Sequence, residues 1–194
     1  MALTDPPIPL PLRDLIPARE LFWRDSRTHG HVHVARVMVH AFRLIAAVGP
    51  EDLAPALWAA VYLHDIARQH DGHCTRHGAD AWARLADLPD VRKLFAAGGV
   101  REFDYPAIKE AVTRHCCGEV APDHAHRRLA ALLKDADGLD RVRIWDLDPR
   151  YLRHPEAVLM VGYANALLGE SLKLPSGPDY FERLWPAAMR LENQ

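Results

Sequence analysis

The sequence predicts an all-α protein, and three observations lead to this prediction. Apolar residues recur at spacings of three and four along most of the chain, which is the period of a helix. No run alternates apolar and polar residues in the way that a half-buried strand does. Glycine and proline stand mainly between the periodic runs, where they end helices. With 194 residues, the chain has the length of one domain with one core, so we expect a single-domain helical bundle.

The chain is predicted to begin with an arm and to continue as one helical domain. Residues 1–17 carry five prolines and should form an extended arm that packs on the domain or frays. Residues 18–194 form the domain, with C-terminal helices within 149–191. The periodic runs predict helices over 31–48, 51–68, 76–88, 89–97, 105–116, 124–139, 155–172 and 177–191.

Local signals support these boundaries in chain order. Gly49 and the following proline stop the first helix, and a loop with Gly72 in it follows the second. The third helix ends before Pro89, which opens the fourth, and a pair of glycines ends the fourth. Pro106 lies in the first turn of the fifth helix, where proline is favoured. The apolar residues of the 155–172 helix could serve either the core or a homodimer contact.

Composition excludes several classes of protein. The formal net charge is -2 and the pI is about 6.6, so no basic surplus indicates nucleic acid as an obligatory partner. No apolar run approaches the roughly 20 residues of a membrane span, and the N-terminus lacks the pattern of a secretory signal. Three cysteines are too few for a disulfide framework, so we expect a reducing, cytoplasmic location.

Five polar residues stand out because they lie on helices whose apolar faces should carry them inward. They are His33, the adjacent pair His64 and Asp65, His115, and Asp137. Burying imidazole and carboxylate groups is costly unless they are paired or bind a metal. Several such groups converging on one interior therefore predict a metal site.

Simpler interpretations exist for the individual residues. A His-Asp pair on an apolar helix is more commonly a hydrogen-bonded core pair than a ligand pair, and Arg43 fits a solvated helix face. Asp135 and Asp140 are expected to be exposed or paired with a nearby arginine, Arg141 or Arg143. The adjacent cysteines after His115 are read as small buried thiols, because no Cys-x-x-Cys motif accompanies them.

Taken together, five segments resemble the motifs of the HD-domain superfamily of metal-dependent phosphohydrolases, in the same order. The match runs roughly from residue 29 to residue 144. No single segment is specific, but five in the right order make chance agreement improbable. The segments are THGHVHVARV, YLHDIARQHD, TRHGADAWARL, AVTRHC and LLKDADGLDRVRI.

The resemblance implies an HD-type helical fold with a divalent metal held between helices. The ligands that it implies are His33, His64, Asp65 and Asp137. Imidazole and carboxylate ligands suit Mn²⁺, Fe²⁺, Co²⁺, Ni²⁺ or Mg²⁺, and the scarcity of thiolate makes Zn²⁺ a weaker candidate. Such a metal polarises a phosphoryl group and activates the attacking water.

Two departures from the family limit the metal prediction. Two-metal branches often carry an adjacent histidine pair, whereas here Cys116 follows His115. His77 could supply one ligand to a second metal, so we favour one metal and leave a second, weaker site open. The Gly-Tyr-Pro segment of the branch that cleaves cyclic dinucleotides is absent, so we set that branch aside.

Cations near the metal would offset charge on the phosphoryl oxygens. Arg68 is the first candidate because it follows His64 by one turn, and Arg36 and Lys134 come next. His115 is either an additional metal ligand or the acid that protonates the leaving oxygen, and the sequence does not separate these roles.

Three functions follow from these observations. The leading one is hydrolysis of a small phosphate ester, a nucleotide or a related phosphometabolite. A di-iron oxygenase on the same scaffold is the second, but it needs two irons, and the cysteine after His115 counts against it. The third is a non-catalytic ligand-binding or regulatory module.

Overall fold

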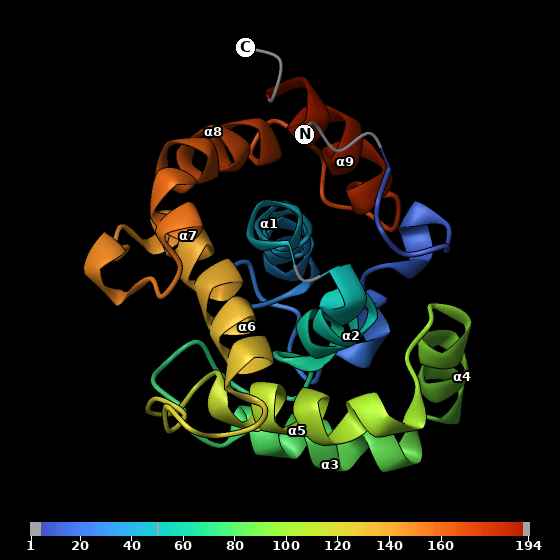
Figure 1. Ribbon diagram of the computed structural model, residues 1–194. Coiled ribbons are helices and arrows are strands. Elements are labelled where there is room, and N and C mark those ends of the chain that lie inside the picture. The colour runs from blue at the N-terminus through green and yellow to red at the C-terminus, as the bar shows by residue number, and fades with distance from the viewer. Residues whose placement is uncertain (1–4, 50, 192–194) are drawn as a thin grey trace.

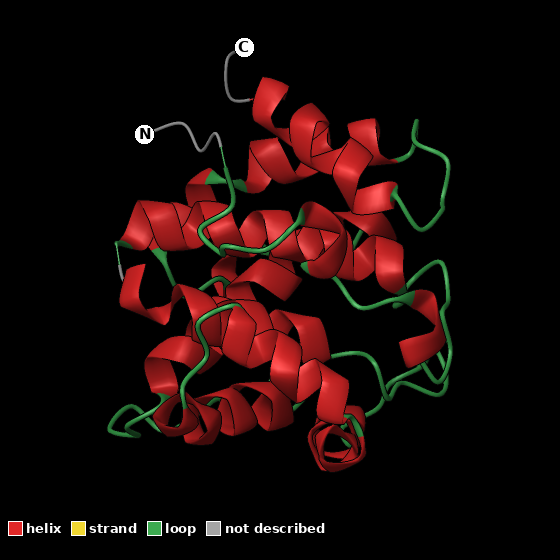
Figure 2. Ribbon diagram, turned by 90° about the vertical axis from the view of Figure 1, so that its right-hand side faces the viewer, coloured by secondary structure: helices red, strands yellow, loops and turns green. Residues whose placement is uncertain are grey.

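The computed structural model describes residues 5–49 and 51–191. Within these residues the chain consists of α-helices, short 3-10 helices and loops, with no strand (Figure 2). The prediction of an all-α fold is therefore confirmed. Residues 1–4 of the arm, Pro50 and residues 192–194 lie outside the described residues.

The α-helices are joined by 3-10 turns and irregular loops. The α-helices are α1 (His31–Val48), α2 (Ala54–Leu63), α3 (His77–Arg84), α4 (Pro89–Ala97), α5 (Tyr105–Arg114), α6 (Arg127–Leu139), α7 (Pro155–Leu159), α8 (Val161–Ser171) and α9 (Tyr180–Leu191). The 3-10 helices cover Leu12–Asp14, Arg19–Leu21, Glu51–Leu53, Leu85–Asp87, Glu102–Asp104, Asp140–Ile144 and Pro149–Tyr151.

Helix α1 is the centre of the molecule, and α2, α6, α8 and α9 surround it (Figure 1). It is long and apolar enough to cross a membrane by length and composition alone, but 72% of it is buried inside the protein, as in a core helix. Gly49 follows its last residue with a left-handed backbone (φ 83°) and donates its N–H to the carbonyl of Ile45. Arg43 packs over the ring of Tyr163 at 3.7 Å, so the predicted solvated face is covered there.

The N-terminal segment packs against the domain through apolar side chains. Ile8, Leu15 and Ile16 are buried. The indole nitrogen of Trp58, a fully buried residue of α2, donates a hydrogen bond to the carbonyl of Leu15 at 2.9 Å. Each large apolar side chain buried in this way stabilises the fold by about 1.5–3 kcal/mol.

Several helix boundaries differ from those that the sequence predicts. Helix α2 ends at Leu63 instead of residue 68, because His64 caps its last turn and the chain leaves the helix there. The predicted 155–172 helix divides at Met160, whose N–H is shared between two carbonyls of the preceding turn. Helices α6 and α9 begin three residues later than expected, at Arg127 and Tyr180. Leu159, the last residue of α7, and Leu172, the residue that follows α8, are exposed.

Candidate metal centre

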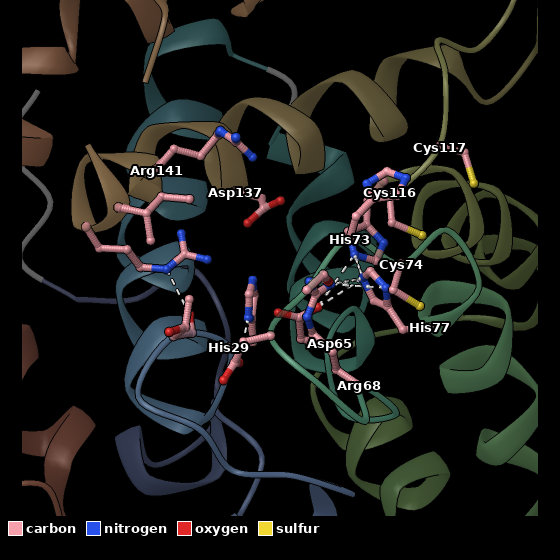
Figure 3. Close-up of a pocket in the computed structure, with 16 residues that line it drawn as sticks. His29, Asp65, Arg68, His73, Cys74, His77, Cys116, Cys117, Asp137 and Arg141 are labelled. Atoms are coloured by element: carbon pink, nitrogen blue, oxygen red, sulfur yellow. Dashed lines mark hydrogen bonds and ion pairs between the residues drawn. The ribbon is translucent and has the colours of Figure 1, made fainter. Parts of the chain in front are cut away.

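The structure brings the five polar residues that the sequence singles out into one cluster. Residues of α1, α6 and the turns that follow α2 and α5 meet there, beside the first residue of α3. A cavity of about 490 Å³ opens onto the cluster (Figure 3). Its walls are formed by Thr28, His29, Asp65, Arg68, Asp71, Gly72, His73, Cys74, His77, His115, Cys116, Cys117, Asp137, Arg141, Arg143 and Ile144.

Two of the histidines are oriented by the helices that they follow. His64 is the first residue after α2, and its Nδ1 donates to the carbonyl of Val61 at 2.7 Å. His115 is the first residue after α5, and its Nδ1 donates to the carbonyl of Val112 at 2.6 Å. The last carbonyls of a helix lack partners within it, so each imidazole satisfies one of them. Each ring then turns its Nε2 toward the centre.

His33 is oriented by a carboxylate instead of a carbonyl. Its Nδ1 donates to Asp140 at 2.7 Å, and Arg36 donates to both oxygens of the same carboxylate at 2.6 and 2.9 Å. All three side chains are almost completely buried. Hydrogen bonds of this kind fix the tautomer and direction of a metal-binding histidine.

The first ligand cluster has the spacing of a metal site. His33 Nε2 lies 3.2 Å from His64 Nε2, 3.3 Å from Asp137 Oδ1 and 3.4 Å from Asp65 Oδ2. A cation with bonds of about 2.1 Å separates neighbouring ligand atoms by about 3.0–3.4 Å. Each ring donates through its Nδ1, so a neutral ring carries its lone pair on Nε2, and a cation between the two Nε2 atoms would bind both lone pairs. The side chains therefore fit a divalent metal.

A second group of donors lies on the other side of Asp65. His77, His115 and Cys116 each offer a ligand atom, and these atoms all lie within 4.8 Å of one another. Asp65 Oδ1 is 3.1 Å from His77 Nε2 and 3.7 Å from His115 Nε2, whereas Oδ2 faces the first cluster. One carboxylate thus stands between two groups of donors, as a bridging ligand of two metals would.

The second group forms only because α3 and α5 approach closely at Gly78. A Cβ atom at this position would overlap the carbonyl oxygen of Val112 and lie 3.1 Å from Nδ1 of His115. The absence of a side chain lets His77, the preceding residue, reach His115 with 2.8 Å between their Nε2 atoms.

The pKa values of ionisable side chains in the centre are shifted far from their usual values. Burial raises the pKa of Asp65, but His64, His115, His77 and His33 outweigh this effect and hold it well below its usual range. Burial lowers the pKa of His64 to about 4, so this ring is neutral at pH 7. Ionised carboxylate beside neutral imidazole is the protonation state that a metal requires.

In the second group the pKa of a histidine is raised and the pKa of a thiol is lowered. Burial lowers the pKa of His77, but hydrogen bonds with Asp65 and Cys116 prevail and raise it to about 10. Burial also raises the pKa of the Cys116 thiol, while His77 and His115 lower it to about 6. In the metal-free protein the group therefore holds a proton between anionic partners, in a place where a cation can replace it.

The three cations that the sequence proposes for phosphate binding lie in different places. Arg68 lines the cavity, with its Nη1 3.2 Å from the His77 ring and its Nη2 donating to the carbonyl of Gly72. Arg36 lies behind His33 against Asp140 and does not line the cavity, so it acts as a positioning residue. Lys134 donates to the carbonyl of Cys117 and lines an adjoining cavity of about 400 Å³.

The prediction that Asp135 and Asp140 are exposed or paired with Arg141 or Arg143 is confirmed for Asp140, whose Oδ2 lies 3.4 Å from Arg143 Nη1. It is wrong for Asp135, which is buried and pairs with Arg153 instead. Both aspartates are completely buried. Asp135 accepts hydrogen bonds from the backbone of Arg153 and from His154, on the face of α6 away from the centre. A helix surrounded on several sides can bury carboxylates on more than one face, which residue spacing alone does not reveal.

Cys116, His29 and Arg143 are among the cavity residues that sequence reasoning does not assign to the site. The sequence predicts a small buried thiol at Cys116, whereas the structure places it against His77. His29 and Arg143 also line the cavity, and Arg143 donates to the carbonyl of Thr28 at 2.8 Å. The signal that could have indicated Cys116 was its position directly after His115, where metal ligands often come in adjacent pairs.

Comparison with protein-family models, with curated proteins and with solved structures gives no match for this chain. Buried histidine, aspartate and cysteine side chains in this arrangement could hold a metal ion.

Proposed function

We propose that this protein is a metal-dependent phosphohydrolase of the HD-domain type that acts on a small phosphate ester. The observation that carries the proposal is the position of Asp65, between two groups of histidine donors and on the wall of an open cavity that arginines line. Nitrogen and oxygen donors at this spacing suit a divalent ion such as Mn²⁺, Fe²⁺, Co²⁺, Ni²⁺ or Mg²⁺.

The cavity combines the metal donors with fixed positive charge. A bound divalent metal supplies Lewis-acid polarisation of the phosphoryl group and lowers the pKa of the attacking water. Arg68 and Arg143 line the same cavity and are anchored by backbone carbonyls, so they are held in place to bind phosphoryl oxygens. Preorganised cations of this kind stabilise the charge that develops on those oxygens.

The rest of the substrate has room next to this cavity. The adjoining cavity shares His115, Asp137 and Arg141 with it, and Lys134 and Tyr151 form further parts of its wall. The two cavities together suit a small molecule such as a nucleotide or a related phosphometabolite, with no obligatory nucleic acid and no membrane. We propose that the reaction takes place in the cytoplasm.

The test is phosphate release by the purified protein loaded with each candidate metal in turn. The substrates are nucleoside monophosphates, an aryl phosphomonoester and an aryl phosphodiester. Asp65→Asn removes the carboxylate that both donor groups share and should lower kcat/KM at least about 100-fold. Asp90→Asn, on the exposed surface of α4, is the matched control and should leave the rate unchanged.

Either of two other results would contradict the proposal and support a different function. Two irons per chain, with oxygen consumption and no phosphate release, would establish the di-iron oxygenase, which the two adjacent donor groups also suit. Metal binding without turnover of any substrate would leave a non-catalytic binding module.

A further inference from the structure

Cys116 gives one half of the metal centre a sulfur donor that the other half lacks. The first cluster contains only imidazole nitrogens and carboxylate oxygens, from His33, His64 and Asp137. The second contains two imidazoles and the thiol of Cys116, with Asp65 Oδ1 3.1 Å from the nearer ring. The two halves therefore differ in the softness of their donors.

The donors of the second group point at a common place. His115 uses Nδ1 to donate to the carbonyl of Val112, so its Nε2 carries a lone pair toward His77 Nε2, 2.8 Å away. Cys116 follows His115 directly and lies against the ring of His77. All four side chains line the same open cavity, so an ion can reach them from solvent.

We propose that Cys116, His77, His115 and Oδ1 of Asp65 form a second metal site that binds Zn²⁺ through a metal–thiolate bond. The first cluster then takes a harder ion, and the protein carries a mixed-metal centre. Loading displaces the proton that the His77 ring holds between Asp65 and the Cys116 sulfur and releases it to water, while the Zn²⁺ ion keeps its oxidation state.

The donor set is the reason for choosing Zn²⁺ at this site. Four donors that combine thiolate, imidazole and carboxylate are typical of zinc, whereas Mg²⁺ and Mn²⁺ favour oxygen donors. The first cluster has no sulfur, so thiophilic ions gain no comparable preference there. This selectivity separates the two sites although one carboxylate links them.

The neighbouring cysteine provides a matched control. Cys117 Sγ donates to the carbonyl of Thr75 at 3.3 Å and contacts the carbonyl of Thr113 at 3.6 Å, so this thiol has partners away from the histidines. It lines the same cavity and differs from Cys116 by one position. Replacing it changes the number of thiols without removing a proposed ligand.

The inference builds on the metal centre of the proposed function, but its test does not use catalysis. The full-length protein is stripped with a chelator and titrated with Co²⁺, because a thiolate–cobalt bond produces a charge-transfer absorption in the near ultraviolet. Zinc content is measured separately, after loading with equal Zn²⁺ and Mn²⁺. Wild type, Cys116→Ser, Cys116→His and Cys117→Ser are compared, with folding checked by circular dichroism.

We expect the charge-transfer absorption in wild type and Cys117→Ser and its loss in Cys116→Ser. Cys116→His should lose the absorption but keep the second metal, because imidazole is also a ligand; this variant distinguishes ligand loss from misfolding. Zn²⁺ affinity should fall at least about tenfold in Cys116→Ser. Absorption that is absent from wild type, or that survives in both Cys116 variants, would overturn the proposal, whether or not the protein hydrolyses phosphate esters.

Discussion

Asp140 lies behind the proposed metal centre, where its carboxylate joins His33 to Arg36. It is completely buried, and the positive charge of Arg36 and the hydrogen bond from His33 hold its pKa well below its usual range, against the effect of burial. One carboxylate thus orients a ligand and compensates a buried guanidinium. At the residue scale, a side chain outside the proposed ligand set controls the direction of a histidine that would bind the metal.

Replacement of Asp140 should weaken metal binding and stability through different partners. Asp140→Asn removes the charge that fixes His33, so Mn²⁺ affinity measured by calorimetry should fall about 10–100-fold. It also leaves Arg36 buried without a counter-charge, which costs about 3–5 kcal/mol.

A double variant separates these two effects. Asp140→Asn with Arg36→Met should recover stability in denaturant unfolding but not metal affinity. The control is Asp148→Asn, whose carboxylate pairs with Arg150 at the surface. Unchanged Mn²⁺ affinity in Asp140→Asn would show that His33 needs no such support.

At the scale of elements, helix ends and one helix contact build the centre. Helices α2 and α5 each end just before a histidine that caps a free carbonyl, and α6 brings Asp137 and Asp140 to its C-terminal end. Carboxylates are unfavourable at the C-terminus of a helix because of its dipole. Arg36 and Arg143 offset this cost, and a metal bound at the proposed centre would offset it further.

The contact between α3 and α5 can be tested at Gly78. A methyl group there would overlap the Val112 carbonyl, so Gly78→Ala must separate the helices and should cost about 1–3 kcal/mol in denaturant unfolding. Separation moves His77 away from His115, and binding at the second metal site should weaken. Gly162→Ala on α8, with no atom within 4 Å of the new carbon, should instead stabilise by up to about 1 kcal/mol. Equal effects of the two variants would contradict the close contact.

At the scale of the whole molecule, the enclosure of α1 determines the state of His40. This residue is completely buried, and neither ring nitrogen has a hydrogen-bond partner within residues 5–49 and 51–191. Burial lowers its pKa to about 4, with Arg36, Arg43 and His33 acting in the same direction and Asp140 opposing them. The ring of Tyr163 lies edge-on at 6.2 Å between centroids. The surrounding helices therefore keep this histidine neutral.

His40 should make the protein sensitive to acid. Below pH 6.5 the unfolded chain takes up a proton that the folded protein does not bind until about pH 4, so stability falls across this window. The loss amounts to about 3 kcal/mol between pH 7 and pH 4. His40→Leu should remove this part of the pH dependence and the cost of the unpaired nitrogens, as measured by thermal unfolding at pH 4.5 and 7.5.

A surface histidine provides the comparison for His40. His124 is exposed, so His124→Leu should leave the difference between the two pH values close to that of wild type. If His40→Leu were as acid-sensitive as wild type, other groups would have to account for the acid transition.

The helical class and the inward direction of His64, His115 and Asp137 could be predicted from the sequence alone. Both follow from local periodicity, because a side chain three or four positions from buried apolar neighbours shares their face. The proposed enzymatic function also came from the order of these residues and was not decided by the fold.

The sequence does not predict which donors meet or which residues orient them, because both depend on contacts between helices. Cys116 joins His77 because α3 and α5 touch at Gly78, and Asp140 reaches His33 because α6 crosses α1 there. The burial of Asp140 and His40 depends on helices distant in sequence that enclose α1. Such contacts depend on how whole helices pack against one another, and the spacing of residues within one helix does not predict that packing.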